Sequence, residues 1–102
     1  MLTLPIKRKW FDMILSKEKS EEYREIKRYY KTRFQTAGLL NEKGLPTGNT
    51  CDIMFRNGYA NTSPSFVATC TLAIKEGNPA WGAVPGIRYY TLKINEMKGR
   101  KK

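Results

Sequence analysis

The segment Phe66 to Ile74, FVATCTLAI, restricts the possible folds of this chain more than any other stretch. Its large apolar residues fall on every second position, a period of two that is typical of a strand with one buried face. CDIMF, residues 51–55, alternates in the same way. Between the two segments, Asn57 and Gly58 tolerate the positive φ that a tight turn requires, so this region predicts a β-hairpin.

The first half of the chain predicts short strands that alternate with helices. Pro5 confines the first strand to a sheet edge or makes it irregular, and Gly38 can close the second helix as its C-cap. The predicted elements are a strand over 2–6, a helix over 9–16, a strand over 20–26, a helix over 28–40, and strands over 51–55, 66–74 and 88–94. This order favours an α+β domain, a small β-barrel of about five or six strands with two short helices. The predicted core comprises Trp10, Phe11, Ile14, Phe55, Phe66, Leu72 and Ile94.

Charge points to the class of partner. The 102 residues include 19 Lys and Arg against 9 Asp and Glu, a formal charge of +10. Such a surface attracts polyanions, which makes RNA or another nucleic acid the leading partner, although a basic balance also simply keeps a small protein in solution. We expect one domain over residues 1–97, followed by a basic tail over 98–102 that acts through electrostatic steering. The N-terminus lacks the apolar core of a signal peptide, and no apolar run is long enough for a membrane helix, so we expect a cytoplasmic monomer without membrane contact.

The absence of histidine narrows the possible chemistry. It excludes Ser-His-Asp and Cys-His catalysis, and it removes the commonest metal ligand. Cys51 and Cys70 lie in strand-like apolar runs, where reduced cysteines behave as small hydrophobic residues, and two cysteines alone do not form a zinc site. We therefore expect neither a metal nor a cofactor.

The segment LSKEKSEEYREIK, residues 15–27, carries unusually many charges at the junction between a predicted helix and a predicted strand. In a strand, Glu22 and Arg24 share one face, about 7 Å apart. With Lys19 on the preceding turn, they could converge at one end of a barrel, where charge-assisted hydrogen bonds would orient the cations. The alternative is that these charges only pair with one another or with a neighbouring strand. We expect Lys19 to face solvent.

Three blocks in a fixed order resemble the ASCH domain, a member of the PUA-like superfamily of small β-barrels. They are IKRKWFDMILSKEKSEEYREIK, FRNGY and WGAVPGIRYYTLKI, and together they span nearly the whole chain. The family signature is a glycine, a lysine two residues on, a glutamate three further and an arginine two further. Lys19, Glu22 and Arg24 match it, whereas Lys17 stands at the glycine position. If the turn keeps a left-handed conformation there, a residue with a Cβ costs about 1 kcal/mol or more.

Further residues are candidates for the same ligand cleft or for a nucleic-acid surface. The segment of Arg56 and Asn57 borders this cleft in the family, although turn formation also explains Asn57. Trp81 could stack on a base or cover the hydrophobic core, and Lys7 adds positive charge beside the cleft. Tyr29 and Tyr30 lie among the basic residues Arg28, Lys31 and Arg33, a pattern that is typical of nucleic-acid surfaces, although the position of Tyr30 on the helical stripe favours the core instead.

Three functions follow as hypotheses. The first is binding of RNA or a nucleotide-like ligand by Lys19, Glu22, Arg24 and Arg56. The second is a hydrolase, because some ASCH relatives are amidohydrolases of acylated cytidine nucleosides, and ribonuclease activity is also compatible with the resemblance; Lys19, Glu22 and Glu76 would then be catalytic. In those amidohydrolases a threonine stands where this chain has Glu22, and the nearest hydroxyl here is Ser20. The third is a protein-interaction module, which would require a large exposed apolar patch.

Overall fold

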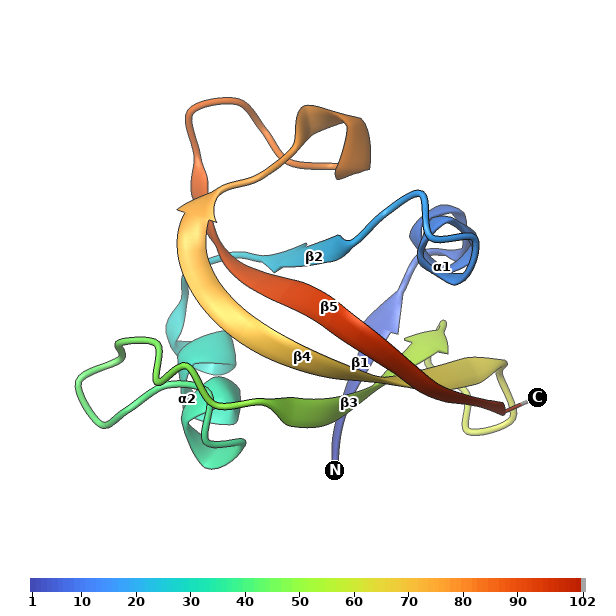
Figure 1. The fold of residues 1–102 in the computed structure, drawn as a ribbon, viewed down its shortest axis with the longest axis horizontal. Coiled ribbons are helices and arrows are strands. Elements are labelled where there is room, and N and C mark those ends of the chain that lie inside the picture. Colours follow the sequence, from blue (N-terminus) through green and yellow to red (C-terminus); the bar gives the residue numbers. More distant parts are fainter. Residues whose placement is uncertain (102) are drawn as a thin grey trace.

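A computed structural model describes residues 1–101, with side chains up to Lys98, as one five-stranded sheet and two α-helices (Figure 1). The elements in chain order are β1 (Leu2–Ile6), α1 (Arg8–Leu15), β2 (Glu21–Arg24), α2 (Arg28–Thr36), β3 (Cys51–Asn57), β4 (Ser65–Glu76), the 3₁₀ turn η1 (Pro79–Trp81) and β5 (Arg88–Lys101). The predicted α+β class is confirmed, and the predicted small β-barrel of about five or six strands with two short helices takes the form of a five-stranded, half-barrel sheet.

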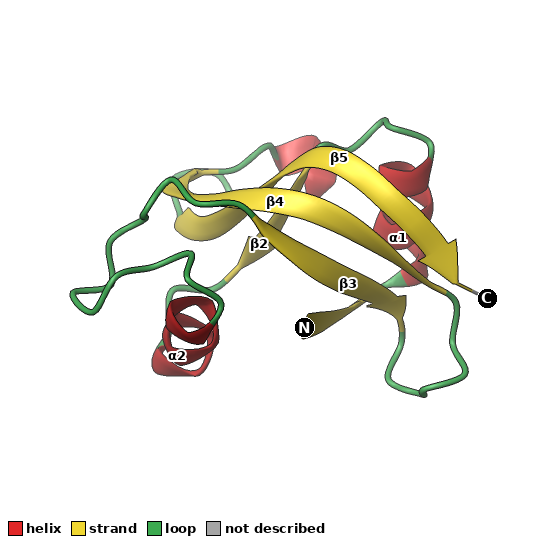
Figure 2. Cartoon of the chain, turned by 60° about the horizontal axis from the view of Figure 1, so that its bottom comes forward, coloured by secondary structure: helices red, strands yellow, loops and turns green. Residues whose placement is uncertain are grey.

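The strand order in the sheet is β1-β3-β4-β5-β2, so β1 and β2 form its two edges. β1 runs parallel to β3, and every other neighbouring pair is antiparallel. The long strands β4 and β5 bend along their length, which curls the sheet into a half-barrel (Figures 1 and 2). Pro5 lies in an edge strand, as its missing N–H donor requires. The curl brings the two edges toward each other, and this seam is where the candidate site forms.

The hydrophobic core lies between the sheet and the helices. Phe66 packs against both Phe11 of α1 and Phe55 of β3, with ring centroids 5.1 and 5.2 Å apart. Five of the seven predicted core residues are buried: Phe11, Ile14, Phe55, Phe66 and Leu72. Ile94 is only partly buried. The prediction for Trp10 is wrong, because this ring is half-buried at the rim and lines a surface cleft instead.

The helices are short and lie at opposite ends of the sheet (Figure 2). Helix α1 has eight residues and α2 has nine, and α1 buries Phe11 and Ile14 while Asp12 faces water. Within residues 1–101, no helix combines the length and the apolar character that a membrane crossing requires.

Strand β5 is longer than its sequence indicates. The pattern RYYTLKI predicts a strand that ends at Ile94, but the backbone continues paired with β4 as far as Lys101. The register shifts twice along this pair, between Val67 and Ala68 and between Thr69 and Cys70. The backbone of the first four residues of the predicted basic tail therefore extends the sheet, while Lys102 lies outside the described residues.

Candidate ligand-binding cleft

The turn after α1 sets the position of Lys19. The helix is capped at Ser16, and Lys17 follows with φ of 70°, the only positive φ of a non-glycine residue in the part of the chain that is described. The backbone N–H of Lys19 then donates to the carbonyl oxygen of Met13 at 3.0 Å. Lys17 therefore adopts the left-handed conformation that a glycine would adopt with less strain.

Lys19 is buried, contrary to the expectation that it faces solvent. Only 1% of the residue is exposed, and its Nζ donates to the carbonyl oxygens of Glu21 at 2.6 Å and Trp81 at 3.2 Å. The same Nζ lies 2.8 Å from Oε1 of Glu22. An ammonium group has three N–H donors, and three acceptors surround this one. Lys19 thus joins β2 to the loop that carries Trp81.

Aromatic rings complete the surroundings of the Lys19 ammonium. Its Nζ lies 5.1 Å from the ring centroid of Trp10 and 4.9 Å from that of Tyr23, distances at which cation–π attraction operates. Burial lowers the pKa of Lys19, and the Glu22 carboxylate opposes this effect without overcoming it. Contacts with protein groups, in place of water, therefore surround the ammonium group of Lys19.

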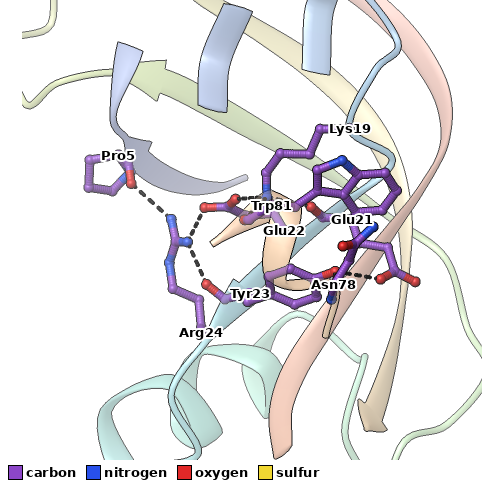
Figure 3. Close-up of polar contacts among 8 residues, drawn as sticks. All are labelled: Pro5, Lys19, Glu21, Glu22, Tyr23, Arg24, Asn78 and Trp81. Carbon is purple, nitrogen blue, oxygen red and sulfur yellow. Dashed lines mark hydrogen bonds and ion pairs between the residues drawn. The ribbon is translucent and has the colours of Figure 1, made fainter. Parts of the chain in front are cut away.

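Glu22 lies between two cations (Figure 3). Its Oε1 faces Lys19, and its Oε2 accepts a hydrogen bond from Nη1 of Arg24. Arg24 also donates to the carbonyl oxygen of Tyr23 at 2.9 Å and, across the seam, to that of Pro5 at 2.8 Å. Through this last bond a β2 side chain connects the two edge strands. Arg24 has five N–H donors, and these three hydrogen bonds use three of them. The other two N–H groups donate to no described residue.

A second network fixes the loop between β4 and β5. The Tyr23 hydroxyl donates to Glu21 Oε1 at 2.7 Å and accepts from the backbone N–H of Asn78 at 2.8 Å. Glu21 also pairs with Lys75 at 2.7 Å. Burial raises the pKa of Tyr23, and the bond to Glu21 adds to this rise. For Glu21, burial alone would raise the pKa, but the hydrogen bonds from Lys75 and Tyr23 outweigh it, so the pKa is lowered.

A cleft of about 500 Å³ opens at the seam between β1 and β2. Its walls come from the end of β1, the start of α1, strand β2, the β3–β4 turn and the loop that carries η1. Gly82 belongs to this loop and has φ of 100°; a Cβ there would lie 2.9 Å from Cζ2 of Trp10. The loop can therefore approach the indole closely only with glycine at this position. The lining residues are Pro5, Ile6, Lys7, Trp10, Glu22, Tyr23, Arg24, Asn57, Gly58, Tyr59, Trp81 and Gly82.

The cleft contains most of the residues that the sequence singled out. Five of them line it: Lys7, Glu22, Arg24, Asn57 and Trp81. Lys19 lies behind Glu22 and supports the wall without lining it. Trp81 is not part of the hydrophobic core, so its alternative role as a cover for the core receives no support.

Two predicted residues lie away from the cleft. Arg56 alternates with Phe55 along β3, so the inward direction of Phe55 turns the arginine to the opposite face, where Nη2 lies 3.8 Å from the sulfur of Met54. Its Nε is buried without a hydrogen-bond partner among the described residues. Glu76 accepts from the backbone N–H of Gly86 at 3.1 Å, inside the loop, and does not line the cleft.

Sequence reasoning missed three aromatic residues of the cleft: Trp10, Tyr23 and Tyr59. Trp10 lies four residues before Ile14, a helical spacing that predicts a core position for both. Tyr23 stands between Glu22 and Arg24 in the sequence, and this position beside two predicted site residues is the feature that could have indicated its place in the cleft. Tyr59, 87% exposed, lies one residue beyond Gly58 in the connection that follows β3, and the turn chemistry of Asn57 and Gly58 gives no reason to single it out.

Comparisons of this chain with protein-family models, with curated proteins and with solved structures give no match.

Proposed function

We propose that this protein is an ASCH-type domain that binds a single-stranded or flipped-out base of RNA, or a nucleotide-like ligand, in the cleft between β1 and β2. The observation that carries the proposal is the combination of flat aromatic surfaces with a fixed pair of opposite charges in one cleft. Trp10, Tyr59 and Trp81 contribute aromatic rings to its lining, and Glu22 and Arg24 offer an acceptor and donors. Bases are recognised in this way, by stacking on aromatic rings and by hydrogen bonds along their edges.

The charges around the cleft support an anionic ligand. The group of Lys19, Glu22 and Arg24 contains two basic residues and one acidic residue. Lys7, at the rim, is exposed and adds another basic residue. A phosphate attached to a bound base would therefore meet net positive charge. A volume of about 500 Å³ also lies within the range of small-ligand sites, about 300 to 1,000 Å³.

The geometry gives the hydrolase alternative less support than binding. A lysine that acts as a general base needs a free Nζ within reach of the substrate. Here the Nζ of Lys19 faces three acceptors and lies behind the cleft wall, and Glu76 takes part in a loop hydrogen bond elsewhere. Binding without turnover requires no rearrangement of these contacts.

The proposal is tested by measuring the binding of randomised single-stranded RNA, duplex DNA and a panel of modified nucleosides at two salt concentrations. Two substitutions of exposed cleft residues, Lys7→Gln and Tyr59→Ala, should each weaken RNA binding about tenfold while leaving the fold intact. The matched controls are Lys93→Gln on β5 and Leu45→Ala in the loop after α2, both exposed and outside the cleft lining.

Because stacking does not depend on salt, the Tyr59→Ala loss should persist at high salt, whereas the Lys7→Gln loss should shrink. Equal losses in the cleft and control variants, or no binding of any probe by the unaltered protein, would contradict the proposal. Consumption of a nucleoside over time would show hydrolysis instead of binding.

A further inference from the structure

Helix α2 presents an exposed basic surface that the cleft does not include. Residues 24–36 contain five cations and one anion, Glu25, and no acidic residue lies within the helix itself. Lys27, Arg28 and Arg33 are exposed. We call the surface formed by Lys27, Arg28, Tyr29 and Arg33 the α2 face.

Aromatic rings are interleaved with these cations. Tyr29 is 54% exposed, and the guanidinium carbon of Arg33 lies 3.7 Å from its ring centroid, a stacked arrangement. Tyr29 also meets Tyr30 edge to face at 5.0 Å, and Nζ of Lys27 lies 5.4 Å from the Tyr30 centroid. An exposed tyrosine that stacks on an arginine presents flat surfaces on which an unpaired base can stack, with positive charge beside them for the phosphates.

Arg24 connects the α2 face to the cleft. Its guanidinium bonds Glu22 in the cleft wall, and its guanidinium carbon lies 5.8 Å from the ring centroid of Tyr30 on α2. Only three residues separate Arg24, the last residue of β2, from Arg28, the first residue of α2. If a polynucleotide with one base in the cleft extends beyond Arg24, its next nucleotides lie beside Lys27 and Tyr29.

We propose that the α2 face is a second contact surface for single-stranded RNA, which binds the nucleotides flanking the base in the cleft. This inference rests on the proposed function and narrows its ligand to a polymer. The cleft accommodates one nucleotide, and the α2 face binds the neighbouring backbone through Arg28 and Arg33 and stacks a flanking base on Tyr29. Affinity should therefore increase with RNA length.

The test compares a randomised pool of RNA tetramers with a randomised pool of 12-mers, both measured by fluorescence anisotropy over a salt series. The double variant Arg28→Gln/Arg33→Gln removes two charges from the α2 face. Lys17→Gln/Lys93→Gln removes the same charge from exposed positions outside both the cleft and α2, and it serves as the control. Tyr29→Ala tests stacking, with circular dichroism and thermal unfolding as checks that each variant folds.

We expect the α2 double variant to lose about tenfold in 12-mer affinity, and its salt slope to fall by about 1.4, from about 0.7 for each phosphate contact on a single strand. Tetramer affinity and the control variant should change less than twofold. Tyr29→Ala should weaken 12-mer binding about tenfold even at high salt.

Two results would overturn the inference while leaving the cleft proposal standing. One is an equal loss in the α2 and control variants, which would indicate a diffuse basic surface. The other is 12-mer affinity that is unchanged in the α2 variants while binding to vesicles with anionic lipid is lost, which would assign the face to a membrane surface. If the unaltered protein binds neither RNA pool, this inference and RNA binding in the cleft both fail, and the panel of modified nucleosides then tests the nucleotide-like ligand separately.

Discussion

Replacing Lys19 by methionine should cost about 3 kcal/mol of unfolding free energy. Methionine matches the side chain as far as Cε and removes the ammonium group, so Glu22, 4% exposed, loses one of its two cations and the carbonyl oxygen of Trp81 loses its donor. Removing one partner of a buried ion pair typically costs about 3 to 5 kcal/mol. Because Arg24 still neutralises Glu22, the lower end of this range applies.

Urea unfolding measures this loss directly. With an m-value of about 1.5 kcal/mol/M, the midpoint should fall by about 2 M. The control is Lys17→Met, two residues away and exposed, which should change the stability by less than about 0.5 kcal/mol. In the double variant Lys19→Met/Glu22→Gln the losses should fall short of the sum of the single variants by about 1 kcal/mol or more, because the two side chains act as a unit. A loss below about 1 kcal/mol for Lys19→Met, or one no larger than the loss for Lys17→Met, would refute the reasoning.

Three further predictions concern the surroundings of the cleft and the core. Lys17→Gly should stabilise the protein by about 0.5 to 1 kcal/mol in thermal or urea unfolding, since φ is 70° there, and a destabilisation would show that the turn is not left-handed. Because the pKa of Glu21 is lowered in the folded state, its contribution to stability is complete above pH 4.5 and is lost as the pH falls through the folded value. Stability measured against pH should therefore fall less steeply on the acid side in Glu21→Gln, and parallel curves would contradict this. Burial raises the pKa of Cys70 to about 12, so iodoacetamide at pH 8 should alkylate native Cys70 at least about tenfold more slowly than Cys51, and equal rates would be the contrary result.

The sequence predicts the strands well where one face alternates cleanly. In β3 and β4 the period of two identifies the inward residues, including Phe55 and Phe66. A shift of one residue in the strand register would turn all of these side chains toward solvent, so the apolar pattern defines the register. The end of β5 was missed for a physical reason. Backbone pairing needs no apolar side chain, so KGRK can continue a strand although its composition is that of a solvated tail.

The site was predicted in part, and the errors follow from contacts that are distant in sequence. The spacing of Glu22 and Arg24 places them on one face, and they do form an ion pair. The burial of Lys19 could not be predicted from its neighbours, because lysine is almost never fully buried without partners, and one of its partners is a carbonyl 62 residues away. Arg56 faces away from the cleft because side chains alternate along β3 and Phe55 points into the core.

Tryptophan fluorescence tests the central claim, that RNA binds in the cleft between β1 and β2. The chain has two tryptophans, Trp10 and Trp81, and both line this cleft, so their emission reports on its occupancy. Titration with randomised single-stranded RNA at a salt concentration that suppresses diffuse binding should quench the emission in a saturable manner, with the midpoint that anisotropy gives for the same RNA. Tyr59→Ala should shift both midpoints together. RNA binding that saturates by anisotropy while the tryptophan emission stays unchanged would place the RNA elsewhere and contradict the claim.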